Sequence, residues 1–397
     1  MIKKIILIMI FVMFVSSVEI CASENTNENE NENPNILENI TGEFYEHYNI
    51  EELEEYYQES GLEGVISYPS IKDFVFGLVK GEINWDVQAM LDGIKSLLFN
   101  ELTLTLNLLA RIIFLSIMAA ILKNISASFG KSQVGDIAFY VVYFVLIGMI
   151  ANSFFTVVTL ASTTIDTMVT FIQAILPTMF ILLASVGAIA SSSMLSPLVL
   201  YIVAFIGTVV NNVVYPLIIG AAVVSLIDHI SSEIKLSNLA KLLKDAALYI
   251  LGFLFVIFLG LVSIQGVAMA TLDGLSAKTA KYAIDNFIPF VGGFLADSMD
   301  TIISASNIIK NGVGIVGLLI IVGIILFPII KMFVLVIMFR VAAAIIQPIS
   351  DERIVKCLSD MSSYILLIMG CVMVIAMMFF LIISIIVLLG DMTVMYR

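Results

Sequence analysis

Histidine, cysteine and charged residues are scarce in this sequence of 397 residues, and each shortage argues against a class of function. Two histidines, His47 and His229, leave almost no material for a histidine metal site or an acid–base pair. The three cysteines are too few and too badly placed for a disulfide framework: Cys21, Cys357 and Cys371. A zincin His-Glu-x-x-His, a Walker phosphate loop and a Gly-x-Ser-x-Gly elbow are also missing. We therefore expect neither an enzyme nor a cofactor site, although catalysis by unpaired carboxylates or by a partner stays open.

Only 13% of the residues are charged and 60% are apolar, whereas soluble domains have about 25% and about 45–50%. The mean hydropathy of +1.07 points the same way. The net charge of −13 comes from one region, because residues 24–63 hold 13 carboxylates and no Lys or Arg. The rest is close to neutral and has no basic face, so we expect a membrane protein that does not bind nucleic acid.

The N-terminus has the order of a secretory signal. Lys3 and Lys4 precede the apolar run 5–15, and a stretch of small residues ends at Ser23. We expect a signal peptide at 1–23, with an uncleaved anchor as the alternative. Residues 24–64 form an acidic arm that we expect to be exported and largely disordered, because its Asn/Glu tract has no apolar surface to bury.

Residues 65–100 have the spacing of two amphipathic helices. Apolar residues recur at helical intervals over 71–79 and again over 87–98, and Trp85 stands where an interfacial aromatic residue would stand. The helices are expected to lie along the outer membrane surface, or to form a small two-helix cap outside it.

The remaining segment, 101–397, predicts an all-α, polytopic transmembrane helix bundle of about seven or eight spans. Backbone groups in lipid must be satisfied internally, so apolar stretches of this length are expected to be helices. An eighth span is either separate at 332–346 or a continuation of the seventh through a kink at Pro328. The seven spans predicted first are 102–122, 137–160, 168–190, 197–226, 247–269, 313–330 and 365–389.

The orientation of these spans is contradictory. The loops 123–136, 227–246, 271–312 and 349–363 hold two, three, three and two Lys or Arg residues, so no side clearly carries the excess. If the first two loops both faced the cytoplasm, an even number of spans would lie between them, but three are predicted. A re-entrant passage at 197–226 would remove the conflict, and nothing else requires one.

Four polar residues lie in stretches that are otherwise apolar. Arg111 either faces a polar cavity or a carboxylate, or it reaches the interface from a surface helix. Asp166 faces protein or water, or lies in a short exposed loop between spans, which we favour. Asn211 and Asn212 are expected to face protein or water, where they would join helices by hydrogen bonds.

Between residues 271 and 312 the chain is less apolar, and Pro289, Gly292 and Gly293 interrupt it. We expect a re-entrant or interfacial element there. The Gly-x-Gly-x-x-Gly pattern that includes Gly314 follows no strand, so we expect close helix packing and not a dinucleotide site. A second amphipathic stretch, 236–244, is expected on a membrane surface or against a partner.

Three motifs carry a resemblance to a known family. They are Phe287-Ile-Pro-Phe-Val-Gly-Gly-Phe-Leu-Ala-Asp-Ser298, Ile309-Lys-Asn-Gly-Val-Gly-Ile-Val-Gly317 and Gln347-Pro-Ile-Ser-Asp-Glu-Arg-Ile354. In this order and spacing they resemble the stage III sporulation protein AE family of endospore-forming bacteria. The similarity runs from about Val65 to the C-terminus. It makes the motif residues Asp297, Asn311 and Pro348 structural or channel positions and not catalytic ones.

The resemblance implies a non-enzymatic subunit of a secretion-like channel complex in the mother-cell membrane. That complex joins the mother cell to the engulfed forespore and is needed late in sporulation. The implied partners are other membrane and ring-forming proteins, indirectly a cytoplasmic ATPase, and the lipid bilayer; a homo-oligomer stays open. A stand-alone secondary transporter or permease is the alternative, because Arg111, Asp166, Lys331 and Arg340 lie within or beside spans. A purely structural scaffold is a third reading.

Overall fold

The computed structural model describes residues 87–128, 133–230, 235–287 and 292–395, with isolated positions at 54–56, 58 and 70. Side chains are described within these ranges except over 264–302 and at a few helix ends. The predicted signal peptide, nearly all of the acidic arm, the first amphipathic helix and Pro289 lie outside the described residues. The described part is helical and contains no strand, which confirms the all-α prediction.

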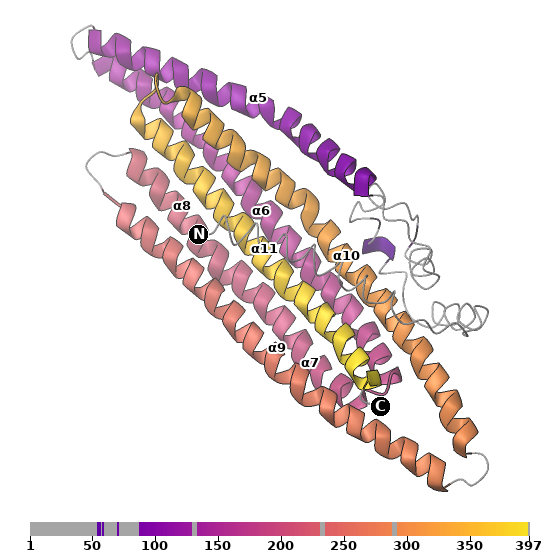
Figure 1. Cartoon of the computed structure of the whole chain (residues 1–397). Helices are drawn as coiled ribbons and strands as arrows, with labels where there is room; N and C mark the ends of the chain where they lie inside the picture. Colours follow the sequence, from indigo (N-terminus) through magenta and orange to yellow (C-terminus); the bar gives the residue numbers. More distant parts are fainter. Residues whose placement is uncertain are drawn as a thin grey trace.

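Six long helical rods make up the bundle, and each is long and apolar enough to cross a membrane (Figure 1). The rods run alternately up and down side by side, so that consecutive rods point in opposite directions. Their bounds are α5 Val87–Ser128, α6 Gln133–Ser185, α7 Ile189–Val209 with η3 Val210–Val214 and α8 Tyr215–Ile230, α9 Ser237–Phe287, α10 Gly292–Ile346 and α11 Glu352–Met395.

One helix, α6, replaces two of the predicted spans. It has 53 residues and continues through the polar stretch near Asp166, where a loop was favoured; that expectation was wrong. Hydroxyl groups explain why polarity does not break the helix. Thr163 donates to the carbonyl of Thr159, and Thr167 to that of Thr163, both at 3.0 Å, so each hydroxyl finds an acceptor within the helix.

The segment 189–230 crosses the bundle as one rod with a π-helical turn, and it is not re-entrant. Pro216 lacks an N–H and its ring crowds the carbonyl four residues earlier, at Asn212. The wider turn η3 precedes it: the N–H of Tyr215 bonds the carbonyl of Val210, five residues back. The proline that appeared to interrupt the run therefore sits beside a local widening of a continuous rod.

The other segments that were predicted to interrupt the helices also belong to longer helices. α10 continues through Pro328, so the stretch 332–346 extends a helix and is not a separate span. A re-entrant or interfacial element was predicted at 271–312; within it, residues 271–287 belong to the end of α9, residues 292–312 belong to the start of α10, and residues 288–291 lie outside the described residues. The two amphipathic stretches 87–98 and 236–244 lie at or near the starts of α5 and α9. Within the described ranges the number of long helices is therefore six.

The core is built around α6, α10 and α11, which pack against one another. Glycine allows the closest approaches. A Cβ placed on Gly314 would overlap Cγ2 of Val387, and one on Gly317 would lie 2.5 Å from Cδ1 of Ile175. The expectation that the glycine pattern serves helix packing is confirmed.

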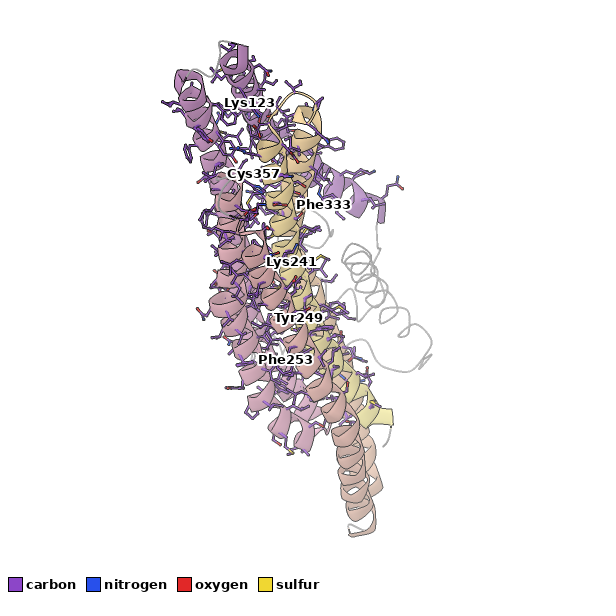
Figure 2. All side chains as sticks on the ribbon, turned by 90° about the vertical axis from the view of Figure 1, so that its left-hand side faces the viewer. Lys123, Lys241, Tyr249, Phe253, Phe333 and Cys357 are labelled. Carbon is purple, nitrogen blue, oxygen red and sulfur yellow. The ribbon has the colours of Figure 1, made fainter. Side chains whose placement is uncertain are left out.

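Charged residues mark the depth of the membrane. Along α11, residues 361–390 between Asp360 and Asp391 hold no charge. At 1.5 Å per residue they span about 45 Å, the thickness of a bilayer with its headgroup regions. The outer face of α9 is apolar over this depth: Tyr249 and Phe253 follow Lys241 along the helix and are 77% and 66% exposed (Figure 2).

The six-helix count removes the conflict of orientation. Two rods, α6 and α7–α8, now separate the loops 123–136 and 227–246, which lie at one end of the bundle together with 349–363 (Figure 1). These three windows carry two, three and two Lys or Arg residues. On the opposite side, residues 186–188 carry none, 271–312 carry three, and Lys95 lies in the first turns of α5. The three basic loops therefore share one end of the bundle, the basic end.

Candidate functional site

Three clusters of polar side chains join the helices at three depths. The first lies at the basic end, where Nε2 of His229 and Oδ2 of Asp360 are 2.9 Å apart and link α8 to α11. Ser225 donates to the same carboxylate oxygen at 3.2 Å. A nucleophilic serine would point at the imidazole, but here both groups face the carboxylate. This trio is therefore arranged as a link between helices and not as a catalytic relay.

The α10–α11 turn at the same end is fixed by Asp351. Its carboxylate accepts the backbone N–H of Arg353 at 2.9 Å, which caps the first turn of α11, and it pairs with Lys123 of α5. Burial raises the pKa of Asp351, but the bonds from Lys123 and the Arg353 backbone, with the charges of both residues, outweigh burial and hold that pKa below its ordinary value of 3.8.

The second cluster lies near the other end, between α10 and α11. Lys310 is fully buried and donates to the carbonyl of Val387 at 2.7 Å and to Oδ1 of Asp391 at 3.2 Å. Asn307 and Asn311 donate to the same oxygen at 3.0 and 3.1 Å. Three donors thus surround one carboxylate oxygen, which compensates a lysine that would otherwise be costly to bury.

The third cluster lies between these two, at the π-helical turn. Nδ2 of Asn211 donates to Oδ1 of Asp166 at 2.7 Å, and Ser162 donates to Oδ1 of Asn211 at 3.1 Å. The amide therefore joins η3 to α6 by two bonds. Asp166 itself remains exposed on the surface of α6.

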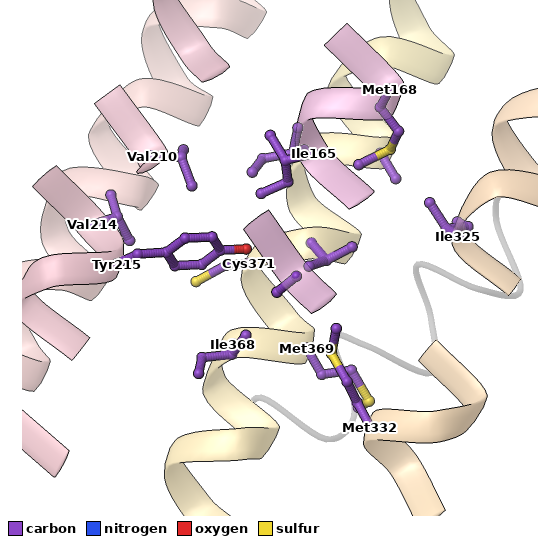
Figure 3. Close-up of a cluster of buried hydrophobic side chains, with 14 of the residues drawn as sticks. Ile165, Met168, Val210, Val214, Tyr215, Ile325, Met332, Ile368, Met369 and Cys371 are labelled. Carbon is purple, nitrogen blue, oxygen red and sulfur yellow. The ribbon is translucent and has the colours of Figure 1, made fainter. Parts of the chain in front are cut away.

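A buried hydroxyl lies close to this third cluster. Tyr215 points from α8 toward Cys371 and α6 (Figure 3). Its hydroxyl is buried and has no hydrogen-bond partner within the described part of the chain. Such a group costs about 1–3 kcal/mol when it stays dry.

A cavity of about 380 Å³ opens between α6 and α10 at a similar depth. Thr163, Thr164 and Thr167 of α6 form its polar wall, Gly323, Ile324, Phe327 and Pro328 of α10 form its apolar wall, and Tyr56 also lines it. Among the described residues, no group of three or more His, Cys, Asp or Glu side chains is placed to hold a metal ion.

Comparison with known proteins assigns the family. The family model of stage III sporulation protein AE matches residues 69–390. The chain belongs to the stage III sporulation protein AE family. It is also 35% identical over 328 residues to the stage III sporulation protein AE of Bacillus subtilis strain 168, covering 83% of this chain and 82% of the relative. No solved structure matches the chain. The family assignment confirms the predicted resemblance.

The structure brings together only some of the predicted positions of this family member. Asp166 and Asn211 meet, whereas Asn212 is exposed on the π-helical turn. Asn311 joins the Lys310 cluster, and Gly314 lies in the α10–α11 contact.

The other predicted positions are separate from these clusters. Arg111 is exposed on α5 and forms no ion pair within the described ranges. Lys331 lies over the ring of Phe327, with 5.7 Å from Nζ to the centroid, and Arg340 donates to Ser362 at 3.3 Å. Pro348 is in the exposed α10–α11 turn. Gly292, Gly293 and Asp297 belong to the first turns of α10, where only the backbone is described.

Sequence reasoning missed the partners that lie far along the chain. Lys310 and Asp391 are 81 residues apart, and His229 and Asp360 are 131 apart. The available signal was that each charge stands alone in an apolar helix. Such a charge requires a partner, but the sequence does not show which residue the partner is.

Proposed function

We propose that this chain is a non-enzymatic membrane subunit of a secretion-like channel complex that connects the mother cell with the forespore late in sporulation. The observation that carries the proposal is the family match over residues 69–390, which spans nearly all of the described helices. The partners proposed are other membrane and ring-forming proteins of the complex and, indirectly, a cytoplasmic ATPase.

The arrangement of charges favours this function over a stand-alone transporter. A transporter gathers its substrate-binding and coupling residues near the middle of the membrane. Here Arg111, Lys331 and Arg340 have separate surroundings, and none pairs with Asp166 within the described ranges.

The predicted secretory signal supports a definite orientation in the mother-cell membrane. It would export the segment that precedes α5. We therefore place the end that holds Lys123, Lys235 and Arg353 in the mother-cell cytoplasm and the end of α9 with the start of α10 on the forespore side.

Deletion of the gene in its own spore former tests the function. We expect complete engulfment followed by arrest of the forespores, with restoration by the wild-type gene. Spores formed at the normal frequency would reject the proposal.

A second pair of measurements separates the classes. Copurification with ring-forming proteins and no solute uptake by purified protein in vesicles is the expected result, whereas uptake by the protein alone would favour the transporter. Arg111→Gln and Arg340→Gln test the scaffold reading: in a scaffold neither charge matters, so spore counts stay normal.

A further inference from the structure

The exposed face of α6 is polar along the depth of the membrane. Seven exposed residues follow one another at alternating intervals of four and three, which keeps them on one line along the helix. Over 22 residues this line is about 33 Å long, enough to cross the hydrocarbon core. We call it the α6 polar line: Asn152, Thr156, Thr159, Thr163, Asp166, Thr170 and Gln173.

Hydrocarbon is a poor environment for this line. The threonines alone could face lipid, because Thr159 and Thr170 donate to carbonyls four residues earlier at 3.0 and 2.8 Å. Asp166 could not face lipid, since a carboxylate at the centre of a membrane helix costs about 2.5–3.5 kcal/mol on insertion scales. Asn152 and Gln173 add to the cost, because their side chains have no hydrogen bond within the described ranges. Water or protein must therefore cover the line.

Two neighbouring features favour water. The buried hydroxyl of Tyr215, directly after the π-helical turn that carries Asn211, has no protein partner in the described part of the chain. Thr163 of the line, with Thr167 beside it, also lines the 380 Å³ cavity against α10. Polar sites with room for water are where proteins hold ordered water.

Charge argues against direct packing of two copies through the line. The interval of 3.5 residues also suits a helix–helix seam, and threonine and asparagine are common in membrane interfaces. In a parallel pair, however, Asp166 would face Asp166 of the second copy in a medium of low dielectric constant, where like charges repel strongly. A water-filled space separates the carboxylates and solvates them.

We propose that the α6 polar line is the wall of a water-filled passage across the membrane, in which Asp166 favours cations. Neighbouring subunits complete the wall, and in this respect the inference rests on the proposed function. The apolar outer face of α9, with Tyr249, Phe253 and Val256, is the lipid-facing side of the same subunit.

Cysteine labelling in membranes of sporulating cells tests the passage. Thr159→Cys, Thr163→Cys and Thr170→Cys are compared with two controls on apolar faces, Phe205→Cys of α7 and Val256→Cys of α9, which are 45% and 66% exposed. The native Cys357 and Cys371 are buried and give little background. Only variants that accumulate in the membrane at the level of the wild-type protein are scored.

A membrane-impermeant, positively charged methanethiosulfonate is expected to modify the α6 positions at least tenfold faster than both controls. Equal rates would overturn the proposal. Disulfide crosslinking of Thr163→Cys between two copies, with protection from the reagent, would overturn it in favour of a helix–helix interface.

The charge of Asp166 has its own readout. At Thr163→Cys, the ratio of modification rates for positively and negatively charged reagents should fall severalfold when Asp166→Asn is added; an unchanged ratio would refute the cation preference. The two proposals fail separately. If the deletion strain arrests but the α6 positions are protected from the reagent, the passage is refuted and the proposed function stands. If the deletion strain sporulates normally but the α6 positions are modified, the proposed function is refuted and the passage stands.

Discussion

Gly314→Ala should loosen the α10–α11 contact that holds the core together. The new methyl group would overlap Cγ2 of Val387 and come within 3.4 Å of Cε of Met179. The methionine can turn away, but valine is restricted at χ1 and only 6% exposed. The clash therefore has to be relieved by moving the helices.

Two opposing effects set the size of the loss. Overpacking a close-packed core costs about 1–3 kcal/mol. Alanine in place of glycine inside a helix returns about 0.5–1 kcal/mol. The net expectation is a loss of about 1–2 kcal/mol in the free energy of unfolding. Adding Val387→Ala removes the overlapping methyl, so the effects of the two changes should be coupled by about 1–2 kcal/mol.

The buried thiols provide the assay. Cys357 and Cys371 are 0% and 1% exposed, so their modification by a thiol reagent in detergent follows unfolding of the purified protein under a denaturant series. Gly148→Ala is the matched control, because a Cβ at Gly148 meets nothing within 4 Å; this change should be neutral or stabilising. If Gly314→Ala and Gly148→Ala shift the midpoint alike, close packing is not the reason for glycine at 314.

Two further substitutions address the charged clusters. Asp391→Asn should cost about 3–5 kcal/mol in the same thiol assay, because it leaves the fully buried Lys310 without its carboxylate, and the double variant Lys310→Met/Asp391→Asn should recover much of this; a double variant no better than the single one would contradict the pairing. The lowered pKa of Asp351 stabilises the fold above its ordinary pKa of 3.8, and this contribution is lost as the pH falls through the lower folded value. Lys123 is 55% exposed, so the effect is about 1 kcal/mol or less. Thermal unfolding of Asp351→Asn should lose this acid dependence, and an unchanged profile would refute the assignment.

Much of the architecture could be predicted from the sequence because hydrophobic length is a local property. Apolar runs of about 20 residues are enough to predict a helical membrane bundle. The glycine pattern at 314 was enough to predict close packing. Helix continuity could not be predicted in the same way. Asp166 was read as a break because its partner, Asn211, lies 45 residues away.

The sequence by itself determined that lipid surrounds most of this protein, that the protein is helical, and to which family it belongs. Composition, periodicity and the three motifs are properties of the chain alone. Only the tertiary structure decided that there are six rods, that the basic loops share one end, and which charges meet. Contacts such as Lys310–Asp391 and Asn211–Asp166 depend on helices brought side by side. A local pattern cannot specify them, because it shows that a buried charge requires a partner but not which distant residue supplies it.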